Sequence, residues 1–201
     1  LYRNLFNRDF FLQAYQNIYA SQGNMTAGTD GKTIDAMSLE RIDRLIAALK
    51  DESYQPKPSR RTYIPKKNGK LRPLGIPSID DKLVQEVVRM LLESIYESSF
   101  EDTSHGFRPD KSCHTALRMI QNRFTRCKWF VEGDIKGFFD NIDHNVMVGI
   151  LRKRIKDERF LRLIRKFLNA GYMEDHQLHQ SYSGTPQGGI ISPILANIYL
   201  D

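Results

Sequence analysis

The sequence predicts an α+β domain that is rich in helices and holds one β-hairpin and a small sheet. Apolar residues recur at helical spacing along much of the 201 residues. Asn68-Gly69 lies between two short strand-like runs and is a strong two-residue turn signal, because both positions tolerate a positive φ. The expected strands are few and do not alternate regularly with helices, which favours the α+β class.

Two amphipathic helices are expected at the start of the chain. Apolar side chains at helical spacing predict the first over residues 9–20. A second apolar stripe follows Ser38, which is a suitable N-cap for the helix. The residues between them, 23–31, contain several glycines and are expected to form an irregular loop.

The hairpin is expected over residues 62–76 and is followed by the longest helix. Pro65 and Pro73 indicate short or edge strands, because proline cannot donate a hydrogen bond to a neighbouring strand. Ser78-x-x-Asp81 resembles a capping box and opens a helix of about 20 residues. The apolar face of that helix is broad, so the helix should be buried, and Asp80-Asp81 is expected to cap it.

The second half of the chain is expected to hold four helices and one strand. The predicted elements are a helix over 112–125, a buried strand over 129–135, helices over 144–155 and 158–170, and a last helix at Ser192-Pro193. Asp143 or Asn141 would cap the helix over 144–155. Ser192 would be the N-cap of the last helix and Pro193 its first helical residue.

The composition is that of a folded globular protein, with 40% hydrophobic and 27% charged residues. The net charge of +6 weakly favours an anionic partner. The distribution of the charge along the chain is more informative than the total. Residues 56–72 hold seven Lys or Arg and no acid, and residues 151–166 hold eight Lys or Arg and two acids. Such stretches suit a polyphosphate backbone, although a solvated hairpin or helix face remains the alternative.

The remaining bulk features indicate an intracellular, cytoplasmic protein. Cys113 and Cys127 are the only cysteines, which makes neither a disulfide framework nor a zinc-finger spacing. No signal peptide is visible. No apolar run reaches the ~20 residues that a membrane span needs.

Asp134 is the strongest candidate for chemistry. It ends the apolar run of the predicted strand, and Glu132 lies two residues earlier on the same face. Hard Mg²⁺ prefers carboxylate oxygens together with phosphates, and phosphoryl transfer uses such ions to neutralise charge. A strand-end Asp that caps a turn is the alternative.

Phe139 and the hairpin cations are candidates for binding a nucleotide. A bulky ring beneath a sugar would clash with a 2′-OH, although most single Phe residues belong to a core. Lys66 and Arg72 should lie near each other across the turn, where they could clamp a triphosphate. Lys67 and Lys70 could contact a phosphate backbone. An exposed basic hairpin is the alternative.

The glycine-rich run before the last helix is a further candidate. Gly188 would allow a ligand to approach the backbone, and Gln187 offers both a donor and an acceptor. The helix N-terminus that follows adds a partial positive charge that favours phosphate. A glycine-rich entry to a helix would be the structural alternative.

Five motifs occur together in one order. They are Ile64-Pro65-Lys66-Lys67-x-Gly69-Lys70-x-Arg72-Pro73, Asp81-Lys82-x-Val84-Gln85, His105-Gly106-Phe107-Arg108-Pro109, Asp134 with Phe138-Phe139-Asp140-x-Ile142-x-His144, and Gly184-Thr185-Pro186-Gln187-Gly188-Gly189. Together they resemble reverse transcriptases, and most closely those encoded by bacterial group II introns, the intron maturases. The resemblance spans nearly the whole chain.

The resemblance implies a right-hand polymerase with fingers over about 1–78 and 145–180, and a partial palm over about 79–144 and 181–201. It implies RNA-directed DNA synthesis with two Mg²⁺ ions, on an RNA template with a DNA primer and dNTPs, together with binding of intron RNA in splicing. The N-terminal segment around Gly28-x-Asp30-Gly31 is similar to the extension that lies on the template.

The resemblance also assigns roles to single residues. Asp134 and the Ile135 carbonyl would be metal ligands, and Phe139 would be the sugar gate. The other implied substrate contacts are Lys66, Arg72, Gln187 and Gly188. The implied nucleic-acid contacts are Arg60, Arg61, Lys67, Lys70, Arg108 and Lys111.

One departure limits these expectations. The family's two further catalytic Asp residues lie in a Tyr-x-Asp-Asp motif that the 201 residues do not contain. We therefore expect these residues alone to be inactive as a polymerase. A non-catalytic RNA-binding splicing cofactor, and a reverse transcriptase of a retron or diversity-generating element, remain the alternative functions.

Overall fold

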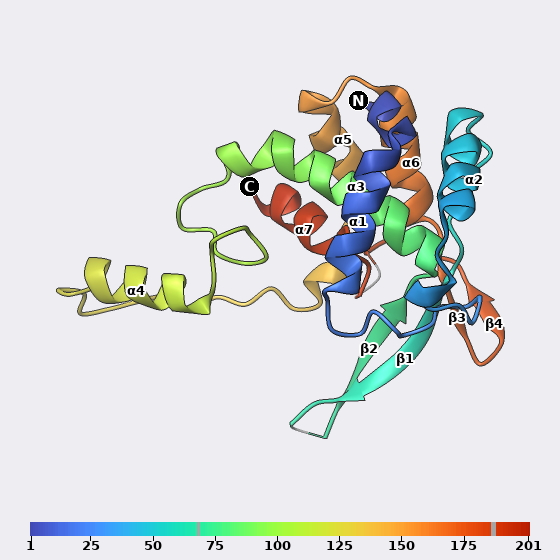
Figure 1. Ribbon diagram of the computed structural model, residues 1–201. Helices are drawn as coiled ribbons and strands as arrows, with labels where there is room; N and C mark the ends of the chain where they lie inside the picture. The colour runs from blue at the N-terminus through green and yellow to red at the C-terminus, as the bar shows by residue number, and fades with distance from the viewer. Residues whose placement is uncertain (68, 186–187) are drawn as a thin grey trace.

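Helix α3 (Ile79–Tyr96) lies at the centre of the body of the molecule in the computed structural model, which describes residues 1–67, 69–185 and 188–201 (Figure 1). The other helices are α1 (Arg8–Tyr19), α2 (Leu39–Lys50), α4 (Cys113–Arg123), α5 (His144–Arg154), α6 (Glu158–Leu168) and α7 (Ser192–Leu200). The strands are β1 (Ser59–Pro65), β2 (Leu71–Ile76), β3 (Tyr172–Glu174) and β4 (Gln177–His179).

Helix α3 begins where it does because Ser78 caps it. The Ser78 hydroxyl oxygen accepts a hydrogen bond from the Asp81 backbone N–H at 3.2 Å, which satisfies one of the free donors at the helix start. Acidic residues in the first turn also favour the helix dipole. The predicted cap and the predicted long buried helix are both confirmed.

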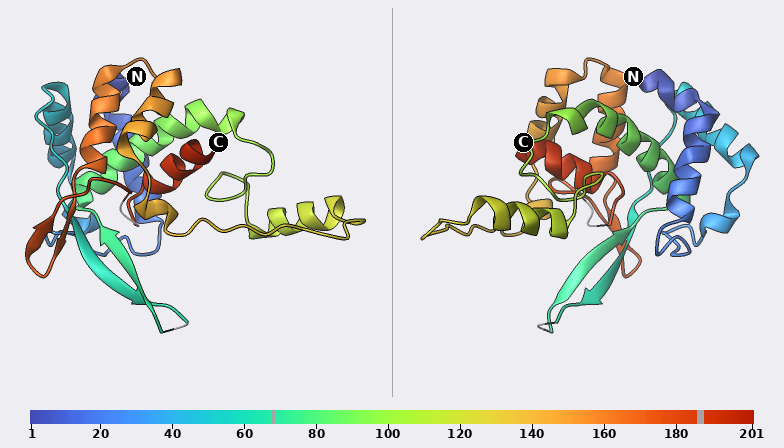
Figure 2. Two further views of the ribbon diagram at one scale, coloured as in Figure 1. Left: turned by 180° about the vertical axis from the view of Figure 1, so that it is seen from behind. Right: turned by 60° about the vertical axis from the view of Figure 1, so that its left-hand side comes forward.

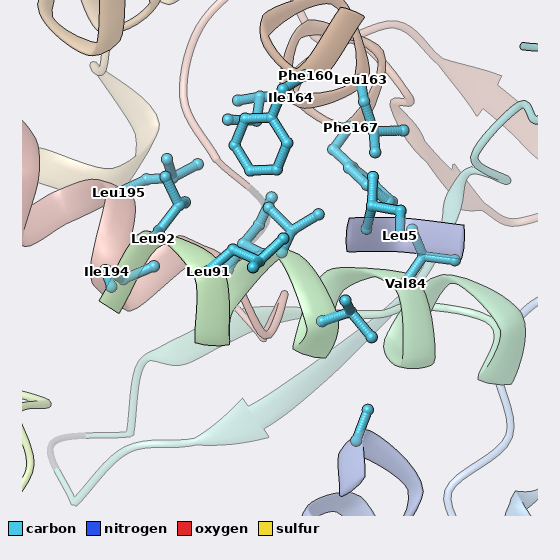
Figure 3. Packing of buried hydrophobic residues seen from close by; sticks show 14 of the residues in the cluster. Leu5, Val84, Leu91, Leu92, Phe160, Leu163, Ile164, Phe167, Ile194 and Leu195 are labelled. Atoms are coloured by element: carbon cyan, nitrogen blue, oxygen red, sulfur yellow. The ribbon is translucent and has the colours of Figure 1, made fainter. Parts of the chain in front are cut away.

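The core forms around α3 because apolar side chains cover most of its surface. Leu83, Val84, Val87 and Val88 are fully buried, and α1 and α7 pack against the helix. Figure 3 shows Leu92 facing Leu195 of α7, and Phe160 and Ile164 of α6 directed toward the same space (Figure 3). Burying one such side chain contributes about 1.5–3 kcal/mol, so this helix accounts for much of the core.

The remaining predicted helices are present, each with an identifiable start. Ser38 caps α2 through the Arg41 N–H, and Asp143 caps α5 through the N–H groups of Asn145 and Val146. The predicted N-cap of α7 is wrong by one residue. Ile191 is the N-cap and Ser192 is already helical, because Pro193 fits either of the first two positions, where no N–H is needed.

The sheet joins two hairpins in the order β2-β1-β3-β4. Strands β1 and β2 pair antiparallel with Thr62 opposite Leu74, which confirms the predicted hairpin. Strand β1 also pairs in parallel with β3, with Ser59 opposite Tyr172. The β3–β4 hairpin was not predicted. Its turn residues, Asp175 and His176, both take a positive φ without the glycine that usually signals such a turn.

The exposed arm, residues 113–135, extends away from the body in each view (Figure 2). Its helix α4 begins with a capping box between Ser112 and Thr115, and none of the helix residues is buried. The buried strand predicted over 129–135 is wrong: these residues form no strand, and Val131 is 100% exposed. A strand needs a neighbour, and no strand of the described residues pairs with this segment.

Among the described residues, no helix combines the length and the apolarity that a membrane crossing requires.

Candidate nucleotide-binding site

Three segments that are far apart in the sequence meet beside the base of the β1–β2 hairpin. They are the end of β2, the short 3-10 helix Phe138–Asp140, and the loop before α7. The Thr185 N–H donates to the Phe139 carbonyl at 2.8 Å, and the Gly184 N–H donates to the Ile142 carbonyl at 2.7 Å. The predicted aromatic motif and the predicted glycine motif therefore lie against each other.

Two glycines make this close approach possible. Gly184 has φ +79°, and a Cβ there would lie 2.7 Å from the Phe139 carbonyl oxygen. Gly188 has φ +110°, and a Cβ there would lie 2.6 Å from the Gly75 carbonyl oxygen in β2. Neither distance leaves room for a side chain, so both positions require glycine. The approach that Gly188 permits in the structure is to the Gly75 backbone of the hairpin, and the predicted approach of a ligand to Gly188 stays a prediction.

Buried polar side chains hold both ends of the glycine-rich loop. His144, at the first position of α5, contacts the Gly184 carbonyl oxygen through Nε2 at 2.7 Å. The Gln85 side-chain oxygen, on α3, accepts the Ile190 N–H at 2.8 Å. Sequence reasoning quoted both residues within motifs but gave neither a role. The signal that could have indicated these roles is a polar residue at a buried helix position, because a buried polar side chain needs a hydrogen-bond partner.

The hairpin register places its cations on defined faces. Arg72 lies opposite Ile64, and the Lys66 N–H donates to the Lys70 carbonyl at 2.7 Å just beyond the last strand pair. Because side chains alternate between the faces of a strand, Lys66, Lys70 and Arg72 share one face. Each of the three is exposed. This placement agrees with the expectation that Lys66 and Arg72 lie near each other.

Two arginines at the base of the hairpin make contacts within the chain. The Arg60 guanidinium donates twice to the Ala27 carbonyl, at 3.0 and 2.8 Å. The Arg61 guanidinium stacks on the Tyr172 ring at 3.7 Å. Both side chains thus join the hairpin to its neighbours, so replacing them would disturb packing as well as any contact with nucleic acid.

Two further predicted nucleic-acid contacts, Arg108 and Lys111, lie near the start of the arm. Arg108 forms a 2.9 Å ion pair with Glu97 and donates to the carbonyls of Glu101 and Ser104, so its guanidinium organises the loop before α4. Lys111 Nζ lies 3.4 Å from the Asp102 carbonyl oxygen. Binding of nucleic acid by Arg108 and Lys111 stays a prediction, as it does for Lys67, which is exposed at the turn.

The predicted metal ligands lie on the exposed arm. Asp134, Ile135 and Glu132 are all exposed. Within residues 1–67, 69–185 and 188–201, no group of three or more His, Cys, Asp or Glu side chains is placed to hold a metal ion. The metal role of Asp134 and of the Ile135 carbonyl therefore stays a prediction. Gln187, the predicted sugar contact, lies outside the described residues, as do Pro186 and Asn68.

The N-terminal loop packs on the other side of the hairpin base. Gly28 approaches the Pro77 carbonyl so closely that a Cβ would lie 2.6 Å from it. Lys82 of α3 donates to the Thr26 carbonyl at 2.8 Å, and burial lowers the pKa of its ammonium group. The loop, the end of β2 and α3 enclose a cavity of about 540 Å³, which Gly188 also lines.

Buried carboxylates fix the segment that leads into the hairpin. Asp81 accepts hydrogen bonds from the Tyr54 hydroxyl at 2.5 Å, the Ser78 hydroxyl at 2.6 Å and the Lys57 N–H at 3.1 Å. Burial raises the pKa of the Asp81 carboxyl, and these hydrogen bonds partly oppose the rise. Asp80 forms a 2.6 Å ion pair with Arg41 of α2. The acidic pair thus does more than cap α3.

Solved structures share this architecture. The chain superposes over its whole length, with a TM-score of 0.64 and 21% sequence identity, on 34% of a chain in the "Partial Cas6-RT-Cas1--Cas2 complex". A second match, "Cas6-RT-Cas1--Cas2 complex", has the same score and identity and covers 21% of that chain. At this identity the likeness establishes the fold alone, an α+β fold of the kind found in reverse transcriptase-containing complexes.

A family model described as "Reverse transcriptase (RNA-dependent DNA polymerase)" matches residues 64–201. The chain belongs to this family. It is 58% identical over all 201 residues to "Group II intron-encoded protein LtrA" of Lactococcus lactis subsp. cremoris. It is 51% identical to "Uncharacterized 91 kDa protein in cob intron" of Schizosaccharomyces pombe and 40% identical to "Protein YkfC" of Escherichia coli.

The chain covers only part of each of these relatives: 34% of LtrA, 25% of the Schizosaccharomyces pombe protein and 55% of YkfC.

Proposed function

We propose that these residues form the fingers and part of the palm of an RNA-directed DNA polymerase encoded by a group II intron. The main support is that the hairpin base, the Phe139 turn and the glycine-rich loop lie in contact. Backbone hydrogen bonds join the Phe139 turn to the loop, and glycines let the loop backbone approach both the turn and the hairpin closely. The fingers span about 1–78 and 145–180 and the palm about 79–144 and 181–201, as the family resemblance implies.

Each element of the site receives one task in nucleotide binding. Lys66 and Arg72, on one face of the hairpin, hold the triphosphate of an incoming dNTP. Phe139, held by the Thr185 N–H, lies beneath the sugar and rejects a 2′-OH. Gly188 keeps the loop close to β2, and the family resemblance assigns the sugar contact to Gln187, which lies outside the described residues.

Asp134 and the Ile135 carbonyl are the ligands that this chain would contribute to a Mg²⁺ site. Bound Mg²⁺ would neutralise charge on the phosphates. The chain's own contribution is to bind the nucleotide and to orient it.

RNA is the proposed nucleic-acid partner. The hairpin tip, with Lys67 and Lys70 exposed, would contact the phosphate backbone without reading bases. Two of the relatives are named as intron products, which favours an intron protein over a retron or a diversity-generating element. A role in splicing would use the same basic surfaces, so the polymerase and maturase roles are compatible.

Replacing Phe139 by Ala or Val in the protein at its full natural length tests the proposal. Removal of the ring should raise the incorporation of ribonucleotides relative to deoxyribonucleotides, because the clash with the 2′-OH disappears. Steady-state kcat/KM for a dNTP and the matching rNTP on an RNA template measures the ratio.

Phe130→Ala is the matched control, since this ring is 78% exposed on the arm. It should leave the ratio unchanged. A Phe139 variant that loses stability and total activity while keeping the wild-type ratio would make this ring a packing residue and would contradict the proposed site.

A further inference from the structure

We infer that His144 is a positioning residue that holds Phe139 in register with the glycine-rich loop and so sets discrimination between deoxyribo- and ribonucleotides. This inference rests on the proposed function of Phe139 as the sugar gate. His144 does not need to touch the nucleotide. It acts through the backbone of Gly184, which lies between the imidazole and the Phe139 turn.

The imidazole of His144 is fixed at both nitrogens. It is 5% exposed, its Nε2 lies 2.7 Å from the Gly184 carbonyl oxygen, and its Nδ1 lies 2.9 Å from the side chain of Asn169. A carbonyl oxygen can only accept, so Nε2 is the donor of the hydrogen bond to the Gly184 carbonyl oxygen. Asn169 is the C-cap of α6, so the ring joins the start of α5, the end of α6 and the loop.

From Gly184, the restraint passes directly to the gate. The Gly184 N–H donates to Ile142 and the next N–H, of Thr185, donates to the Phe139 carbonyl. A Cβ on Gly184 would lie 2.7 Å from that carbonyl oxygen and 2.9 Å from the Asp140 Cα, so the two backbones are already in contact. A shift of Gly184 therefore moves the turn that carries Phe139.

The Phe139 ring depends on this backbone for its position. It is partly exposed and meets Phe138 edge-to-face at 5.7 Å between ring centres, so its main chain decides where it points. A gate that senses one hydroxyl group must be placed to within a fraction of an ångström, and support from behind the site supplies that precision. His144 is the buried side chain that gives this support to Gly184.

The inference predicts a change in selectivity, measured in the protein at its full natural length. His144→Leu removes both hydrogen bonds and keeps a buried side chain, so the rNTP:dNTP ratio of kcat/KM should rise about tenfold, the equivalent of about 1.4 kcal/mol. His144→Gln keeps an N–H donor and should restore most of the discrimination. His114→Leu, at an exposed histidine of α4, is the control that should keep the wild-type ratio.

A second variant covers the case in which His144→Leu does not fold. Asn169→Leu removes only the contact to Nδ1 at an exposed position, and should shift the ratio in the same direction by a smaller factor. An unchanged ratio in Asn169→Leu and in every folded His144 variant would overturn the inference.

A double variant separates this inference from the proposed function. If His144 acts through Phe139, His144→Leu in the Phe139→Ala background should add nothing to the ratio already reached by Phe139→Ala. If the changes in the ratio caused by the two substitutions multiply in the double variant, His144 acts independently of Phe139. If Phe139→Ala alone leaves the rNTP:dNTP ratio unchanged, the proposed sugar gate is refuted. If Phe139→Ala changes the ratio and His144→Leu does not, only the role of His144 is refuted.

Discussion

Helix α3 and the exposed arm both carry large apolar side chains, but the body buries those of α3 and the arm leaves its own in solvent. Leu83 and Val88 in α3 are fully buried, while Trp129 is 90% exposed and Val131 is 100% exposed. An amphipathic helix needs only a complementary apolar surface, which α1, α6 and α7 provide. A strand also needs a neighbouring backbone, so an apolar run alone does not bury itself.

The largest expected effect comes from one substitution made in both regions. Phe160→Ala, at a fully buried position in α6, should lower the free energy of unfolding by about 3–5 kcal/mol, because it removes buried surface and leaves a cavity. Phe130→Ala on the arm should change it by less than about 0.5 kcal/mol. Urea denaturation of the chain followed by circular dichroism measures both, and equal losses would show that the arm belongs to the core.

Removing a helix cap in the body or in the arm should give a smaller difference in stability between the two regions. Ser38→Ala removes the cap of α2 in the body and should cost about 1 kcal/mol of global stability. Ser112→Ala removes the equivalent bond in α4 and should weaken only that helix. Amide hydrogen exchange distinguishes the two, since faster exchange should be confined to residues 113–123 in the second variant. A comparable fall in the global unfolding midpoint for Ser112→Ala would argue against an independent arm.

The smallest expected effect is a pH dependence within the body. Burial raises the pKa of Asp81 above its ordinary value of 3.8, so the folded state binds this proton more tightly than the unfolded state. The stabilising contribution is therefore full below pH 3.8 and declines as the pH rises through the raised pKa. Asp81→Asn does not titrate, so the stability of wild type minus that of the variant should fall from low pH to neutral pH. Unfolding midpoints of both proteins at successive pH values test this, and a difference that is flat or rises with pH would contradict it.

The helices could be predicted because their signals are local. Ser38, Ser78 and Asp143 each bind N–H groups within three residues along the chain, so these bonds need no partner from a distant segment. The β1–β2 hairpin has a similarly local signal in Asn68-Gly69. The predictions that failed or were missed depend on distant partners: the strand over 129–135 has none among the described residues, and the β3–β4 hairpin is placed by its pairing with β1.

The candidate site shows the same limit. The sequence was sufficient to single out Phe139 and Gly188, because an aromatic and a glycine in those motifs carry recognisable chemistry. It did not reveal that Gly184 contacts the Phe139 turn or that His144 holds Gly184, because these contacts join segments some 40 residues apart. Such roles become visible only when hydrogen-bond partners are known.

The parallel pairing of β1 with β3 has a consequence for how the protein is made. Ser59 lies opposite Tyr172, more than half of the chain away, and the Ser59 N–H donates to the Gly171 carbonyl. While the ribosome synthesises the intervening residues, the outer edge of β1 has no neighbour and offers free backbone groups to other chains. Pairings of this kind close late, because a long loop must be ordered first. The start of β1 at Ser59 and Arg60, which later pairs with β3, is therefore open to association in the nascent chain until β3 emerges, and slowing translation after residue 76 should lengthen that period.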